Sequence, residues 1–265
     1  MRKTNTLKKG ANAMTNVTEI LMSEEFKNSA AVAAALDILS NSLSYVGDCW
    51  DNSCMEADQL DELVYHYKSL EWGCGATKVA VMFKNFVLKS NYSQVVEWDE
   101  GDYDEENETY VGGGFTDPCD WEDCDYCWVE SRVYEKAIEA GVADFFAPTI
   151  PVGMTGVYIQ ARADREVAYT NWIQYLNGVG KSRYEIRFGE EAFEELRQEL
   201  QLQRISRPIF SYWLDNASYV QLKKLGQFLH KHCINDLHNH NIGWFGDKIL
   251  LFDYSGYHSG TEDTL

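Results

Sequence analysis

The chain has 265 residues, of which 45% are hydrophobic and 14% aromatic. This composition excludes extensive disorder and allows roughly three quarters of the unfolded surface to be buried on folding. Lys and Arg number 23 against 42 Asp and Glu, and the net charge of −19 disfavours direct nucleic-acid binding while suiting basic or cation-bridged partners.

No membrane span or secretory signal is expected, because the sequence has neither a long apolar run nor an apolar segment after its basic N-terminus. Seven cysteines, an odd number, favour reduced thiols over a disulfide framework. The expected location is therefore the cytoplasm.

Two amphipathic helices are predicted in the first 70 residues. The second covers 58–70, with Leu60 and Leu63 on its apolar side. Residues 1–70 are interpreted as an N-terminal tail and helical extension that packs on the main domain. The apolar positions of the first helix recur at helical spacing: Val32, Leu36, Leu39 and Leu43.

From Trp72 the pattern changes to β-strands. Strands are predicted over 79–83 and 86–88, joined by a tight turn at 84–85. A preceding strand would end in the turn Gly73-Cys74-Gly75.

An acidic insertion follows, assigned to 91–125. Between Asn91 and Cys127 there are 13 Asp and Glu residues and no Lys or Arg, so most of the net charge lies here. The segment is expected to be loop-like, with a hairpin around glycines 112–114. It is either a solvated loop or a docking surface for a basic partner.

The second half of the chain alternates helices with short strands. Gly141 is expected to end the first of these helices. Helices are predicted over 126–140, 189–204 and 219–233, strands over 145–150 and 156–161, and a hairpin over 241–252 with its turn at Gly246-Asp247.

Three polar residues near the C-terminus carry the clearest chemical pattern. Asp236 follows a predicted helix, Asn241 comes five residues later, and Asp253 follows the predicted hairpin. Phosphoryl transfer needs one carboxylate to orient the acceptor hydroxyl. It also needs an amide oxygen and a second carboxylate to hold Mg²⁺ against the phosphates.

The stretch Asp236-Leu237-His238-Asn239-His240-Asn241 resembles the D-x-x-x-x-N catalytic loop of the protein-kinase-like superfamily. Asp253-Tyr254-Ser255-Gly256 lies where that family has D-F-G, with one residue inserted. The pattern is similar to small bacteriophage-encoded kinases and kinase-like proteins, and to aminoglycoside phosphotransferases. The resemblance implies that Asp236 is the catalytic base and that Asn241 and Asp253 bind Mg²⁺.

The same resemblance assigns residues upstream. Gly73 and Gly75 are similar to a shortened glycine-rich loop, and Lys89 stands where the family places its phosphate-binding lysine. A helix glutamate should pair with this lysine, and either Glu130 or Glu135 could do so. Glu130 is preferred, because residues 130–134 resemble the family's E-x-x-x-Y helix start.

The resemblance further implies a hinge at Gln160 to Ala163, where the backbone, including that of Gln160 and Ala161, would meet the adenine of ATP. The expected fold is α+β with two lobes: an N-lobe over 71–163 and a minimal helical C-lobe over 164–265.

Three departures from the family pattern bear on function. Ile234 replaces the usual His, and Asn235 replaces the Arg that would receive an activation-loop phosphate. Only nine residues follow Gly256, so neither an activation segment nor the usual peptide-docking helices are expected.

These features predict an ATP- and Mg²⁺-dependent (or Mn²⁺-dependent) phosphotransferase acting on a protein hydroxyl, in the host cytoplasm if a phage encodes it. A pseudokinase that binds a basic, possibly host, protein is the alternative. A small-molecule kinase is a third reading, and nucleotidyl rather than phosphoryl transfer stays open.

A zinc site is a further hypothesis. Cys119, Cys124 and Cys127 form C-x₄-C-x₂-C, and zinc prefers four thiolate or imidazole ligands. Free thiols are the favoured alternative. A fourth ligand could come from one of three other cysteines: Cys49, Cys54 or Cys74.

Overall fold

The computed structural model describes residues 17–46, 53–104, 109–117, 119–120, 125–163, 181–235, 237, 241–245, 248–255 and 261–265. Within these ranges the chain is a mixed α+β protein. None of the helices described in these ranges is long and apolar enough to cross a membrane.

The central element is a five-stranded antiparallel sheet in the order β10-β11-β5-β4-β3. Its strands are β3 (Glu71–Cys74), β4 (Lys78–Met82), β5 (Phe86–Asn91), β10 (Thr149–Pro151) and β11 (Tyr158–Ala161). The predicted pair of strands around the turn at 84–85 is confirmed, as is the strand that precedes Gly75. The strand predicted from residue 145 begins only at Thr149, because residues 143–145 form a 3₁₀ turn, η1 (Ala143–Phe145).

Four helices precede this sheet, and two of them directly contact its strands β3 and β5. They are α1 (Val17–Met22), α2 (Glu24–Lys27), α3 (Ala30–Leu39) and α4 (Ala57–His66). The Ser29 hydroxyl caps α3 by accepting a hydrogen bond from the Val32 N–H. Both predicted helices are present but shorter than expected. Leu43 is fully buried although α3 ends at Leu39, because it packs as part of the extended segment entering the next strand.

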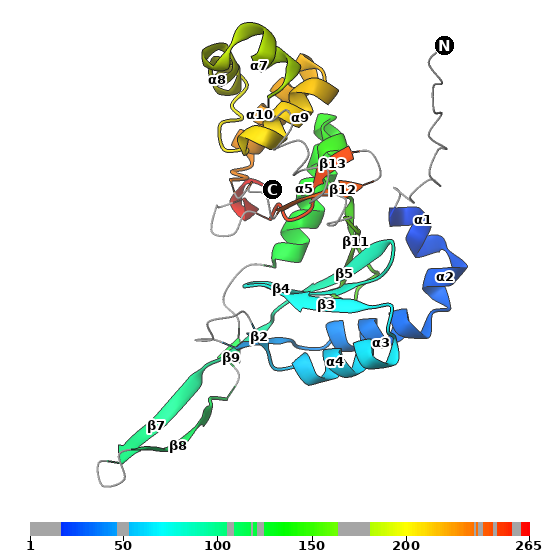
Figure 1. Cartoon of the computed structure of the whole chain (residues 1–265). Helices are drawn as coiled ribbons and strands as arrows, with labels where there is room; N and C mark the ends of the chain where they lie inside the picture. Colours follow the sequence, from blue (N-terminus) through cyan, green and yellow to red (C-terminus); the bar gives the residue numbers. More distant parts are fainter. Residues whose placement is uncertain are drawn as a thin grey trace, which may run out of the picture.

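A second small sheet lies at the end of the acidic segment, in the order β2-β1-β6-β9. Its strands are β1 (Ser44–Val46), β2 (Ser53–Cys54), β6 (Gln94–Val96) and β9 (Cys119–Asp120). Between β6 and β9 the chain forms a hairpin of β7 (Trp98–Asp104) and β8 (Thr109–Phe115), which projects away from the body of the molecule (Figure 1). The expected hairpin is therefore present. Its glycines, however, lie within β8 rather than at the turn, since Gly112 pairs with Gly101.

The remaining helices and the C-terminal hairpin form a second hydrophobic core. They are α5 (Tyr126–Ala140), α7 (Arg183–Phe188), α8 (Glu190–Glu199), α9 (Arg207–Asn216) and α10 (Tyr219–Lys231), followed by β12 (Ile242–Phe245), β13 (Lys248–Leu251) and the 3₁₀ turn η4 (Glu262–Thr264). In Figure 1, α7 to α10 lie above the sheet, with α5 and the β12–β13 hairpin between them.

Helix α5 has the predicted bounds. Asp125 begins it, because its carboxylate accepts a hydrogen bond from the Trp128 N–H at 2.9 Å. Gly141 ends it with φ of 70°, a left-handed conformation that glycine adopts without a steric cost. These two caps fix the start and the end of α5, and Glu130 lies in the second turn between them.

The other predicted helices and the hairpin are also present. The helix predicted over 189–204 ends at Glu199, and that over 219–233 ends at Lys231. Helix α9 was not predicted from the sequence. Strands β12 and β13 pair as expected, with Ile242 opposite Leu251.

Candidate functional site

The two faces of the five-stranded sheet differ in character. Val79, Val81 and Leu88 are fully buried in the core that includes the N-terminal helices. Because side chains alternate along a strand, Lys78 and Lys89 lie on the opposite face. That face turns toward α5 and the segment after β13.

The pairing of the strands places Lys89 and its neighbours in one row across the sheet. Gly73 on β3 pairs with Ala80 on β4, which pairs with Lys89 on β5, and Lys89 pairs with Tyr158 on β11. The small residues at 73 and 80 leave the β4 and β3 side of Lys89 without bulky side chains, and both are half-buried.

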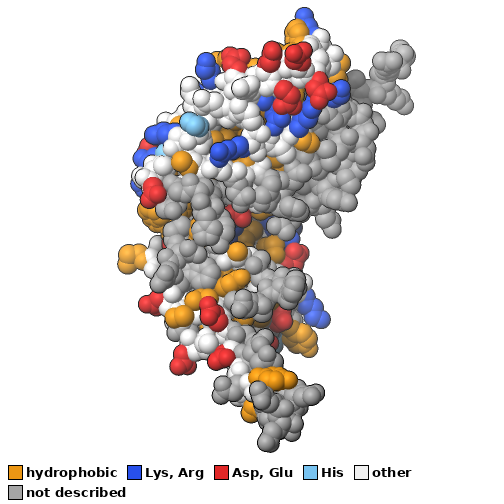
Figure 2. All heavy atoms as spheres, turned by 90° about the vertical axis from the view of Figure 1, so that its left-hand side faces the viewer, with side chains coloured by type: hydrophobic (Ala, Val, Ile, Leu, Met, Phe, Trp, Pro, Cys, Tyr) orange, Lys and Arg blue, Asp and Glu red, His pale blue; other side chains and the backbone are white. Residues whose placement is uncertain are grey.

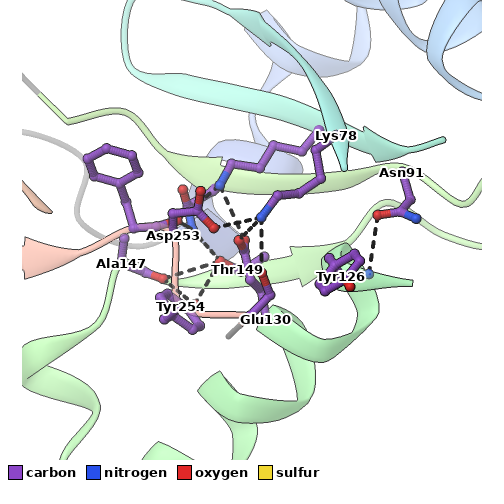
Figure 3. Close-up of polar contacts among 12 residues, drawn as sticks. Lys78, Asn91, Tyr126, Glu130, Ala147, Thr149, Asp253 and Tyr254 are labelled. Carbon is purple, nitrogen blue, oxygen red and sulfur yellow. Dashed lines mark hydrogen bonds and ion pairs between the residues drawn. The ribbon is translucent and has the colours of Figure 1, made fainter. Parts of the chain in front are cut away.

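Four charged side chains meet over this face, and we call them the charge cluster: Lys78, Lys89, Glu130 and Asp253. The Lys78 ammonium donates to Glu130 Oε1 at 2.5 Å and to Asp253 Oδ1 at 2.7 Å. The Lys89 ammonium donates to Glu130 Oε2 at 3.2 Å. Figure 3 shows Lys78 reaching from the sheet toward Glu130 and Asp253. One carboxylate of α5 is thus shared by two lysines from neighbouring strands.

Lys78, Lys89 and Glu130 are strongly shielded from water. The Glu130 side chain is fully buried, whereas Asp253 keeps 39% of its side-chain surface exposed. Burial raises the pKa of Glu130, although both lysines oppose that shift. For Asp253, burial acts in the same direction, but the lysines outweigh it and hold its pKa well below the usual range. Asp253 is therefore ionised at neutral pH.

The segment carrying Asp253 is held in place by its neighbours in the chain. The Phe252 carbonyl accepts hydrogen bonds from Lys89 Nζ at 3.0 Å and from Gln160 Nε2 at 2.8 Å. The fully buried Tyr254 donates its hydroxyl hydrogen to the Ala147 carbonyl at 2.7 Å. Asp253 is thereby fixed between two anchored residues.

Asn241 lies beside this segment. Its backbone carbonyl accepts a hydrogen bond from the Phe252 N–H at 3.0 Å. Asn241 therefore lies opposite Phe252, the residue before Asp253, at the open end of the hairpin. The hairpin also approaches the chain that leaves β11, because a Cβ added at Gly243 would come within 2.2 Å of the Ala163 Cβ.

Two residues here carry oxygen groups of the kind that bind divalent cations. Asp253 has an ionised, partly exposed carboxylate, and Asn241, whose backbone carbonyl is bonded to Phe252, has a side-chain amide. Mg²⁺ takes oxygen ligands and usually keeps several waters, so one carboxylate with one amide suits it. The two residue types fit the cation, but Lys78 at 2.7 Å competes for the same carboxylate.

The structure brings several of the predicted site residues together. Lys89 and Glu130 are paired, and Asp253 reaches the same cluster through Lys78. Glu135, the alternative partner of Lys89, is exposed on α5 and pairs instead with Arg132. Asp236, the predicted base, lies outside the described residues.

The predicted hinge and glycine loop are positioned as follows. Gln160 and Ala161 belong to β11 between β10 and β5, so their backbone groups are part of the sheet. The Gln160 side chain donates to Thr149 Oγ1 at 2.7 Å as well as to Phe252. Gly73 lies on β3, the strand at the edge of the sheet. The Gly75 N–H donates to the Lys78 carbonyl at 2.9 Å across the turn between β3 and β4.

Lys78 is the site residue that sequence reasoning missed. It begins a strand, where a lysine is ordinarily a solvent-exposed residue. The available signal was its alternation with Val79 and Val81, which places Lys78 on the same sheet face as Lys89 once the β4–β5 register is known.

The proposed zinc ligands do not form a cluster among the described residues. Cys119 is exposed on β9, whereas Cys127 is buried in the first turn of α5, and Cys124 lies outside the described ranges. Burial raises the pKa of the Cys127 thiol, which disfavours the thiolate that zinc requires. No group of three His, Cys, Asp or Glu that could hold a metal occurs in the described ranges.

The comparisons with known proteins give no relative. No protein-family model, no curated protein and no solved structure matches the chain. Function must therefore be argued from the site itself.

Proposed function

We propose that this protein is an ATP- and Mg²⁺-dependent phosphotransferase of the protein-kinase-like type, with a two-lobed fold, that acts on a protein hydroxyl. The observation that supports the proposal is the charge cluster. Lys89 of the sheet pairs with Glu130 of α5, 41 residues away, and Lys78 joins the same glutamate to Asp253 after the C-terminal hairpin, 175 residues from Lys78. Phosphoryl transfer is catalysed by positioning and charge neutralisation, which such a set can supply.

Each residue has a distinct role in this proposal. Lys89 contacts the nucleotide phosphates, and Glu130 fixes the Lys89 ammonium in place by accepting its hydrogen bond. Asp253 and Asn241 hold Mg²⁺, which neutralises the charge of the phosphates when it is bound. Asp236 accepts the proton of the acceptor hydroxyl.

The test is intact-mass spectrometry after incubation with ATP and Mg²⁺ or Mn²⁺, alone and with host-type cell lysate. We expect a phosphate gain on the protein or on a lysate protein with the parent, and none with Asp253→Ala. Asp236→Ala should lose a factor of about 10²–10⁴ in rate, the usual contribution of a positioned base, while still binding nucleotide. A nucleotide-sized gain would replace phosphoryl by nucleotidyl transfer, and no gain with the parent would overturn the proposal.

A second candidate, a binding module for a basic protein, is favoured by the β7–β8 hairpin. Its two strands pair only with each other among the described residues, so both outer edges are open. Acidic residues recur along β7 at Asp99, Glu100, Asp102 and Asp104, and the whole segment has no Lys or Arg. In Figure 2 the lower part of the molecule, toward the hairpin, shows Asp, Glu and hydrophobic side chains.

This candidate predicts salt-dependent binding of a lysine-rich peptide through the hairpin. Calorimetry at low and high salt should show binding that weakens with salt, because exposed charges are screened. A variant with Asp99, Asp102 and Asp104 changed to Asn should bind weakly at both salt concentrations. Equal binding by parent and variant would exclude the hairpin as the docking surface.

A further inference from the structure

Lys78 is the best-connected side chain of the charge cluster. Besides Glu130 and Asp253, its ammonium donates to Ser255 Oγ at 3.2 Å. Its side chain is 11% exposed, and no residue of the kinase-like set predicted from the sequence corresponds to it. The role of this second lysine has to be explained from its position.

The contact between Lys78 and Asp253 conflicts with metal binding. An ammonium 2.7 Å from Oδ1 uses the carboxylate that the metal would need, and two cations on one carboxylate repel each other. The partial exposure of Asp253 shows that its carboxylate can be reached from solvent. A metal at Asp253 therefore requires Lys78 to leave.

Lys89 does not occupy the Asp253 carboxylate. Its ammonium is bound to Glu130 and to the Phe252 carbonyl, and it acts on Asp253 through its charge rather than through a hydrogen bond. Metal at Asp253 can thus coexist with Lys89. Once displaced, Lys78 needs a new anionic partner beyond Glu130, and the phosphates that arrive with the metal are the nearest anions of that kind.

Building on the function proposed above, we propose that Lys78 is a second phosphate-binding lysine that exchanges places with the metal ion. In the ligand-free protein it occupies Asp253. When a metal–nucleotide complex binds, the metal replaces it at Asp253 and Lys78 moves to the phosphates. The side chain is long, and it starts from the first residue of β4 beside the 75–77 turn, so the ammonium can move without disturbing the sheet.

This exchange predicts two effects of opposite sign for Lys78→Met. Mn²⁺ binding in the absence of nucleotide, measured by electron paramagnetic resonance, should strengthen by about tenfold, the size of effect that neighbouring groups have on metal sites. ADP binding at a Mg²⁺ concentration that saturates both proteins, measured by calorimetry, should weaken by about tenfold because a charge-assisted hydrogen bond is lost.

Two further variants keep the test informative. Lys89→Met should weaken ADP binding but strengthen Mn²⁺ binding less than Lys78→Met does, because Lys89 acts on Asp253 through its charge and does not bond its carboxylate. Lys78→Arg should retain both ADP binding and the competition with Mn²⁺. Lys78→Gln, which keeps a hydrogen-bonding group, replaces Lys78→Met if circular dichroism shows the latter to be unfolded.

The outcomes separate this inference from the proposed function. Unchanged or weaker Mn²⁺ binding in folded Lys78→Met and Lys78→Gln would overturn the exchange. Stronger Mn²⁺ binding with unchanged ADP binding would show that Lys78 blocks the metal but contacts no phosphate, which also overturns it. A parent that binds Mn²⁺ but no nucleotide would refute the proposed function, and the Mn²⁺ comparison would still show whether Lys78 occupies the metal site.

Discussion

The two faces of the five-stranded sheet use the same strands for different purposes. On one face, Val79, Val81 and Leu88 are buried in an apolar core, where removal from water stabilises the fold. On the other face, Lys78 and Lys89 are nearly as well shielded but carry charge. Burying charged groups costs free energy that their pairing only partly offsets. Pairing alone therefore does not explain why the polar face keeps these charges, and the nucleotide binding that we propose gives them a role.

The largest expected effect comes from breaking the charge balance of the polar face. Glu130→Ala leaves two buried ammonium groups with one carboxylate, and we expect a loss of about 3–5 kcal/mol in the free energy of unfolding. Urea denaturation of parent and variant measures it. Glu135→Ala is the matched control on the same helix, because its exposed ion pair with Arg132 should contribute about 1 kcal/mol or less. Similar losses in both variants would contradict the shared-carboxylate interpretation.

A substitution on the apolar face tests the other half of the comparison. Leu88→Ala should lower the free energy of unfolding by about 2–5 kcal/mol, because Leu88 is fully buried and its removal leaves a cavity. Nucleotide and Mn²⁺ binding by the folded fraction should stay close to parent values. A loss of binding without a loss of stability would reverse the roles that we assign to the two faces.

The pH dependence of stability provides a weaker, directional test. The pKa of Asp253 is lower in the folded protein than in the unfolded chain, so its ionised form stabilises the fold above the unfolded value of about 3.9. That contribution is lost as the pH falls through the folded pKa. We therefore expect the stability difference between parent and Asp253→Asn to be about 1 kcal/mol or less near pH 7, since Asp253 is partly exposed, and to shrink toward pH 3. A difference that grows on acidification would contradict the assignment.

The smallest effect is expected outside both faces. Tyr103 on the projecting hairpin is 53% exposed, and Tyr103→Ser should change the free energy of unfolding by no more than about 0.5 kcal/mol. Thermal unfolding of the two proteins measures this. A larger loss would show that the hairpin packs against the body of the protein.

The sequence predicted an element well where the residues that determine it lie close together in the chain. Helix α5 was predicted with its bounds, and Gly141, the signal used for its end, acts within one turn of the residues that it caps. The C-terminal hairpin was predicted from its own turn. The glycines of β8 were misplaced, because glycine is common in turns and nothing nearby in the sequence reveals that Gly112 pairs with Gly101.

The same limit applies to the site. Lys89 and Glu130 were selected through a resemblance, and their contact depends on how α5 packs against the sheet. Lys78 was missed because its partners, Glu130 and Asp253, are 52 and 175 residues away in the chain. A pattern among neighbouring residues in the sequence does not reveal contacts of this kind. They become visible only when the strand register and the packing of α5 are known.

The most direct test of the central claim is calorimetric titration of the parent, Lys89→Met and Lys84→Met with ATP and Mg²⁺. Lys84 lies in the exposed turn between β4 and β5 and serves as a lysine control away from the charge cluster. We predict one binding event in the parent, an unchanged affinity for Lys84→Met, and an affinity at least about tenfold lower for Lys89→Met, because a hydrogen bond to a charged group contributes about 1.5–3 kcal/mol. Absence of binding to the parent, or equal affinities for all three proteins, would contradict the claim that the polar face of the sheet is a nucleotide site.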